Sequence, residues 1–188
     1  MKKFLSPILM ACSLFTGSLY AQIDTISIDL GNSAITSVSP WNNLTNEDNG
    51  SVTDLLNQSG FTTGYGVAVT DSFNGNNTAG LRSTNALFSA DKDTNACADS
   101  FFGSAVPAVE GHQPTGGITF YHLDPNKAYG FAIYASRGGA TDNRETKYII
   151  DGATKDSANL DAAANVANIL QFTGIAPKAD STLTITAT

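Results

Sequence analysis

The sequence predicts an all-β protein, an antiparallel β-sandwich of jelly-roll or fibronectin-like type with few or no helices. Several short segments place apolar residues at every second position, which is the pattern of strands with one buried face. Stretches of turn-forming residues separate them, and the chain has 17 glycines and only 14% charged residues. Short strands at such spacing are typical of a sandwich. With 188 residues and no internal repeat or linker, we expect a single β-sandwich domain over 22–188.

Residues 1–21 have the layout of a secretory signal peptide. Two lysines follow the first Met, an apolar stretch covers 4–19, and Ala21 offers a small residue for cleavage. We therefore expect a secreted or cell-surface protein, in the periplasm or outside the cell, with no transmembrane segment. The residues Leu9–Cys12 resemble a lipobox, so a lipoprotein anchored through Cys12 is the alternative.

The charge balance of the mature chain excludes two classes of partner. Removal of the signal peptide takes away two lysines and no acidic residue, which leaves 8 basic and 17 acidic residues and a formal charge of −9. Nucleic acids and anionic lipids both require basic clusters, so neither is an expected partner. Cys97 is the only cysteine that remains, which rules out an intrachain disulfide.

The first half of the chain predicts strands at 26–30 and 65–69, where large apolar residues recur at alternate positions. Between them, 51–58 is predicted to form one or two helical turns, because Ser51 is placed to cap them. The polar segment 71–99 is long for a loop in a compact domain. We expect it to be functional or to contain short strands that have no clear pattern.

The second half has a clearer strand pattern. Strands are expected at 117–123, 128–137, 146–151, 168–173 and 182–188. The alanine-rich segment 158–167 fits a helix, but its asparagines suit a loop equally well.

Tyr129 follows a turn over 123–126 that contains Pro125. In sandwich proteins a tyrosine just after such a turn uses its hydroxyl to bond the backbone a few residues upstream. Because the proline sets the turn directly ahead of it, we expect Tyr129 to form this corner. The alternative is an ordinary strand aromatic.

Several stretches together carry a resemblance to known proteins. They are Ile28–Gly31, Pro40–Thr45, Asp99–Gly103, Leu123–Arg137, Asp142–Tyr148, Asn165 with Asn168, and Gly174 with Pro177. In these the chain resembles a family of secreted bacterial β-sandwich domains, described as fibronectin-like or galactose-binding-like, that accompany polysaccharide degradation. The resemblance covers most of 26–186. It implies an accessory module, alone or attached to carbohydrate-active enzymes and esterases, without a defined catalytic motif.

Sugar recognition needs a flat aromatic face and planar hydrogen-bonding groups. The candidate ligand-binding residues are Trp41, Asn43, Arg137, Asp142 and Arg144. Trp41 is the only tryptophan and lies in a polar loop, while the two arginines flank a glycine-rich loop. Two structural alternatives remain open: Trp41 closes one end of the sandwich, and Arg144 pairs with an acidic neighbour such as Asp142.

A second candidate site is a structural calcium ion. Oxygen-bearing side chains stand at alternating positions in one acidic segment, as at the start of a calcium loop. The candidate ligands are Asp91, Asp93, Asn95 and Asp99. The pattern departs where glycine and the closing glutamate are expected, so an acidic solvent-exposed loop is the alternative. No cofactor is otherwise required.

No catalytic residues are predicted. The aspartates cannot be told apart from turn residues, and neither His112 nor His122 stands in a nucleophilic motif. We therefore expect a non-catalytic carbohydrate-binding or accessory module that recognises a polysaccharide or cell-surface glycan through its end loops. The alternatives are a structural or adhesive surface protein without a sugar site and a small polysaccharide-active hydrolase.

Overall fold

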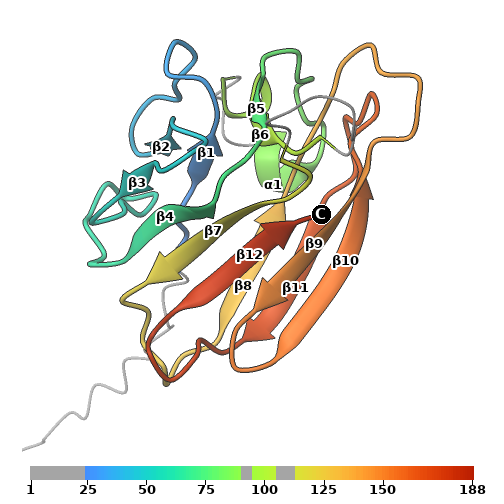
Figure 1. Ribbon diagram of the computed structural model, residues 1–188. Coiled ribbons are helices and arrows are strands. Elements are labelled where there is room, and N and C mark those ends of the chain that lie inside the picture. Colours follow the sequence, from blue (N-terminus) through green and yellow to red (C-terminus); the bar gives the residue numbers. More distant parts are fainter. Residues whose placement is uncertain (1–23, 90–94, 105–112) are drawn as a thin grey trace, which may run out of the picture.

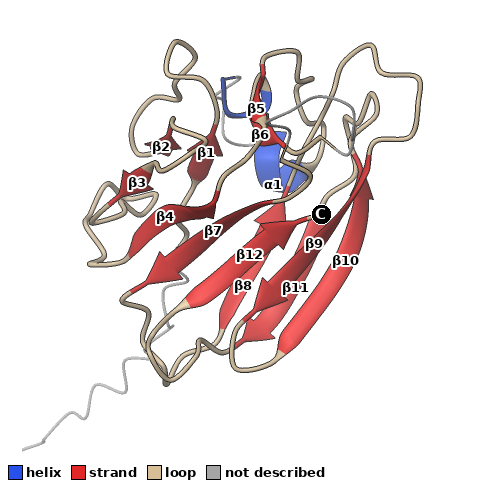
Figure 2. Cartoon of the chain, in the orientation of Figure 1, coloured by secondary structure: helices blue, strands red, loops and turns tan. Residues whose placement is uncertain are grey.

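The computed structural model describes residues 24–89, 95–104 and 113–188 (Figure 1). Figure 2 shows that strands and loops dominate these residues. The strands are β1 (Ile28–Leu30), β2 (Asn42–Leu44), β3 (Ser51–Val52), β4 (Gly66–Asp71), β5 (Gly75–Asn77), β6 (Ser100–Phe102), β7 (Gly116–Tyr121), β8 (Tyr129–Ile133), β9 (Glu145–Asp151), β10 (Lys155–Asp161), β11 (Leu170–Ile175) and β12 (Leu183–Ala187). The described helices are α1 (Ala86–Ser89) and the short 3-10 helix η1 (Asn95–Cys97). The predicted all-β class is confirmed.

The largest element is a six-stranded sheet in the order β10-β9-β12-β7-β4-β3. Every neighbouring pair in it is antiparallel. The other described strands form three separate pairs, β11–β8, β5–β6 and β1–β2, of which β1–β2 is parallel. Because the second layer consists of pairs rather than one sheet, the complete sandwich stays a prediction.

The hydrophobic core lies between the six-stranded sheet and the β8–β11 pair. Leu183 and Ile150 of the sheet are 0% exposed, and Phe172 of β11 belongs to the same buried cluster. The rings of Phe120 on β7 and Phe131 on β8 are 5.5 Å apart, which joins the two layers directly. Burial of large apolar and aromatic side chains is the main term that stabilises such layers.

The strand expected at 65–69 is observed as β4, and those expected in the second half are observed within a few residues as β7, β8, β9, β11 and β12. The segment 71–99 contains the short strand β5 together with α1 and η1. Of the two alternatives considered for this segment, a short strand without a clear pattern is therefore observed. Among the described residues, no helix is long and apolar enough to span a bilayer.

The helical turns predicted at 51–58 are wrong. This segment contains β3, and Leu56 then forms an isolated bridge with Thr62. The backbone of Asp54 is left-handed, with φ of 53°, and this turn directs Leu55 into the core, where it is 0% exposed. Burial of Leu55 outweighs a weak capping signal, since helix propensity is readily overridden by tertiary contacts.

The segment 158–167 is neither a helix nor wholly a loop, because its first residues belong to β10. Strand β10 pairs with β9 in unbroken register, and the buried Leu160 faces the core. Ala158 and Leu160 alternate with polar residues, which is a strand pattern that the alanine content obscured. The predicted signal peptide and Cys12 lie outside the described residues.

Candidate functional site at the loop end

Three long loops lie at the same end of the molecule, drawn at the top of Figure 1. They cover residues 31–41, 77–85 and 137–144, and we call this region the loop end. It contains or adjoins every predicted ligand-binding residue. Loops held by a rigid sheet are the usual place for recognition, because few of their side chains are needed to pack the core.

Trp41 stands at the base of the first loop, directly before β2. Its side chain is half-buried, while Val38 at the turn is 72% exposed. The backbone amide of Trp41 donates to the carbonyl of Val38 over 3.1 Å, which closes the turn. Trp41 is therefore neither sealed in the interior nor fully exposed.

Asn43 braces the loop that carries Trp41. Its Oδ1 accepts from the Ser37 amide at 2.7 Å, and its Nδ2 donates to the Ser37 carbonyl at 2.9 Å. An amide side chain can match a backbone amide in this two-way fashion. The observed role of Asn43 is to hold the loop, and direct contact with a sugar remains a prediction.

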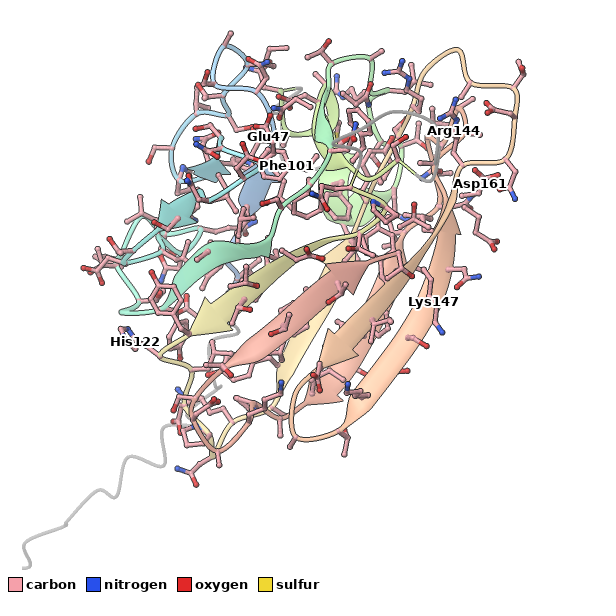
Figure 3. All side chains as sticks on the ribbon, viewed as in Figure 1. Glu47, Phe101, His122, Arg144, Lys147 and Asp161 are labelled. Carbon is pink, nitrogen blue, oxygen red and sulfur yellow. The ribbon has the colours of Figure 1, made fainter. Side chains whose placement is uncertain are left out.

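The two arginines belong to the third loop but have different surroundings. The guanidinium of Arg137 donates to Oδ1 of the buried Asn77, at the end of β5. Arg144 and Asp142 form the ion pair that we considered, with Nη2 and Oδ2 3.1 Å apart. Their side chains are 53% and 62% exposed, so the pair adds little stability and stays accessible. In Figure 3, Arg144 lies beside Asp161, which accepts from the Arg144 amide at 3.0 Å.

The Trp41 loop and the arginine loop are connected in steps. A chain of hydrogen bonds links them through the middle of the loop end. The Asn95 side chain donates to the Thr36 carbonyl over 2.8 Å. The backbone amide of Gly80 then donates to the carbonyl of Ala98 over 2.8 Å. The amide of Gly138 donates to the carbonyl of Ala79 over 2.6 Å. Residues 79–80 and 95–98 therefore connect the two predicted halves of the site.

The predicted calcium ligands are described only in part. Asp91 and Asp93 lie outside the described residues. Asn95 is directed to Thr36, as above. Asp99 is 5% exposed, and its Oδ2 accepts from the backbone amide of Asn32.

Burial raises the pKa of Asp99 to about 6; the amide of Asn32 acts in the opposite direction, and the charge of Asp29 raises the pKa further. Asp29 lies on β1 and is 3% exposed. A buried carboxylate near Asp99 was not anticipated from the sequence, because the two aspartates are far apart along the chain.

Four buried asparagines were also missed. Asn42, Asn57, Asn77 and Asn165 are between 5% and 9% exposed. Asn165, for example, donates to the carbonyls of Ala135 and Asn168, each over 2.9 Å. These side chains satisfy backbone groups where the sheet pairing ends. In the sequence they looked like ordinary loop polarity.

The described histidine lies away from the loop end. His122 is exposed at the far end of β7, opposite Arg144 in Figure 3. Its φ of 61° places it in a turn. The ring centroids of His122 and Tyr121 are 4.9 Å apart, in an edge-to-face arrangement. His112 lies outside the described residues.

Comparisons of the chain with protein-family models, curated proteins and solved structures found no match. The resemblance to secreted β-sandwich domains therefore stays a prediction from the sequence.

Proposed function

We propose that the chain is a non-catalytic, exported carbohydrate-binding or accessory module that recognises polysaccharide through the loop end. The observation that carries the proposal is the setting of Trp41. Trp41 is half-buried, and the loop that holds it is braced by the paired contacts of Asn43 with Ser37. A rigid, part-exposed aromatic is the surface on which sugar C–H groups stack at low entropic cost.

Polar groups of the arginine loop supply the second part of the proposed site. Arg144 and Asp142 form an exposed pair whose remaining N–H and oxygen groups face solvent. Such groups read sugar hydroxyls by hydrogen bonding. A polysaccharide chain that lies along the loop end could contact both Trp41 and this pair.

The charge of the mature chain favours a neutral glycan. Its 8 basic and 17 acidic residues give a formal charge of −9, which repels uronate and sulfate polymers at moderate ionic strength. We therefore expect glucans, xylans or galactans to bind in preference to polyanions. A structural surface protein without a sugar site is the main competing function.

Affinity electrophoresis tests the proposal. The full chain is produced in a bacterial host, collected after export, and run in gels that contain a neutral glucan, a xylan, a galactan or a polyuronate. Retardation by a neutral polymer is expected, with loss in Trp41→Ala. The control is Phe61→Ala, because Phe61 is 70% exposed on a loop of a different region.

Three outcomes are informative. Retention lost in Trp41→Ala and kept in Phe61→Ala supports the proposal. Failure of the wild type to bind any polymer overturns it in favour of a structural role. Release of reducing sugar from a polymer would instead identify a hydrolase.

A further inference from the structure

We propose that Asp29, Asp99 and Ser37 form a binding site for a hard divalent cation, with calcium the expected ion. The site differs from the acidic segment considered from the sequence, because it joins β1, the loop 31–41 and the residue before β6. It does not depend on the sugar-binding proposal.

Asp29 supplies one carboxylate from the middle of β1. It is 3% exposed, and its Oδ2 accepts from the Ser37 amide at 3.2 Å. This contact places residue 37 directly against the Asp29 carboxylate. Strand β1 also packs against η1 and β6. Asp99 lies between these two elements and is therefore brought close to β1.

Asp99 supplies the second carboxylate. Its Oδ2 accepts from the Asn32 amide, but its Oδ1 is buried and has no hydrogen-bond partner among the residues that the structure describes. The carboxylate lies against Gly31, where a Cβ would collide with it. A buried carboxylate oxygen without a donor is costly, and an ion that it coordinates removes this cost.

The hydroxyl of Ser37 is the second observation that points to a ligand. Ser37 is 5% exposed, and its Oγ is buried with no hydrogen-bond partner in the described part of the chain. Its own backbone amide and carbonyl are used by Asp29 and Asn43, so the residue is held in place while its hydroxyl stays unsatisfied. A hydroxyl oxygen is a suitable ligand for a hard cation.

Electrostatics favour a cation over an empty site. The two carboxylates are close enough for the charge of Asp29 to act on Asp99. No ion pair to Asp99 occurs among the residues that the structure describes. A buried carboxylate such as that of Asp99 requires compensation of its charge, and calcium accepts carboxylate, hydroxyl and carbonyl oxygens in flexible geometry.

Among the described residues, no group of three His, Cys, Asp or Glu side chains is placed to hold a metal ion. The proposed site therefore has two carboxylates and is completed by neutral oxygens. Its consequence is mechanical: an ion shared by Asp29 and Asp99 ties the loop 31–41 to the segment that follows η1.

The test measures the thermal unfolding of the exported full chain after treatment with EDTA. Calcium chloride is added against magnesium chloride and sodium chloride of equal ionic strength. At 100 times its dissociation constant, calcium is expected to raise Tm by about 5–10 °C. The rise should disappear in Asp29→Asn and Asp99→Asn and persist in Asp156→Asn, an exposed residue of β10.

Ser37→Ala keeps the inference testable if the aspartate variants do not fold. It should bind calcium more weakly than the wild type in a calorimetric titration. Trp41→Ala should keep the full calcium response, which separates this inference from the sugar-binding proposal.

Three results would overturn the inference. The first is a Tm that does not respond to calcium. The second is a higher Tm in Asp99→Asn without a calcium response in the wild type, which would indicate a protonated carboxyl. The third is a response lost in Asp91→Asn with Asp93→Asn but kept in Asp29→Asn, which would place the ion in the acidic segment instead.

Discussion

The hydroxyl of Tyr129 accepts a hydrogen bond from the backbone amide of Asp124, with 2.9 Å between Oη and N. The same hydroxyl donates to the hydroxyl of Tyr65 over 3.4 Å, and the two rings meet edge to face at 6.0 Å. The corner that we predicted from Pro125 and the following strand is confirmed. It fixes the turn between β7 and β8, and it therefore sets how β8 crosses onto the second layer.

Tyr129→Phe should lower the free energy of unfolding by about 1 kcal/mol, because the Asp124 amide loses its acceptor while the ring stays in place. Urea denaturation of the two proteins measures the difference. Tyr121→Phe is the matched control, since its hydroxyl reaches the Val52 carbonyl only at 3.5 Å. Equal losses of stability in both variants would show that the hydrogen bond from Asp124 to Tyr129 stabilises the fold no more than the long contact of Tyr121 does.

Tyr129 also predicts a loss of stability in alkaline solution. Burial, helped by the hydrogen bond to Tyr65, raises the pKa of Tyr129 to about 12. The unfolded chain loses this proton near pH 10, whereas the folded chain holds it to about pH 12, so the stabilising contribution is complete below pH 10 and falls as the pH rises through this window. Urea midpoints between pH 9 and 12 should fall less steeply in Tyr129→Phe. Identical slopes would contradict the assignment.

Asn165→Ala, between β10 and β11, should strongly destabilise the protein. Its amide donates to two carbonyls and accepts from the backbone amides of Ala167 and Asn168. Truncation leaves several of these groups unsatisfied, with an expected loss of about 2–4 kcal/mol in urea denaturation. Asn159→Ala is the control, because this exposed side chain only meets Glu145 and should change stability by less than about 0.5 kcal/mol. A small loss in Asn165→Ala would mean that water replaces the amide.

The strands were predictable where an apolar alternation is backed by large side chains, as in β7, β9 and β12. Strand β10 was missed because only Ala158 and Leu160 mark its buried face, and alanine also suits a helix. Strand β3 was missed because two residues carry no period. Local pattern therefore predicts elements that bury large residues and fails for those that depend on their neighbours.

The candidate sites were less predictable than the strands. The pairing of Arg144 with Asp142 was accessible to sequence reasoning because the two are neighbours in the chain. The approach of Asp29 to Asp99 was not, because it depends on how β1 packs against η1 and β6. The buried asparagines were not predicted for the same reason. Asparagine is common in loops, and only its burial in the folded chain distinguishes a side chain that bonds the backbone from one that faces solvent.

Gly31→Ala tests whether the Asp99 carboxylate is held as tightly as the structure indicates. An added Cβ would collide with this carboxylate, so the variant should lose about 1–3 kcal/mol of stability. In an Asp99→Ala background the obstacle is gone, and the same change should cost at least about 1 kcal/mol less, since residues in contact do not have additive effects. Urea denaturation of the four proteins gives this coupling.

Gly130→Ala on β8 is the control. Its added Cβ would make only an ordinary contact at 3.4 Å, so this change should show no coupling to Asp99. Additive effects of Gly31→Ala and Asp99→Ala would mean that the carboxylate moves away at little cost, and a carboxylate that moves so easily could not hold an ion in a fixed site.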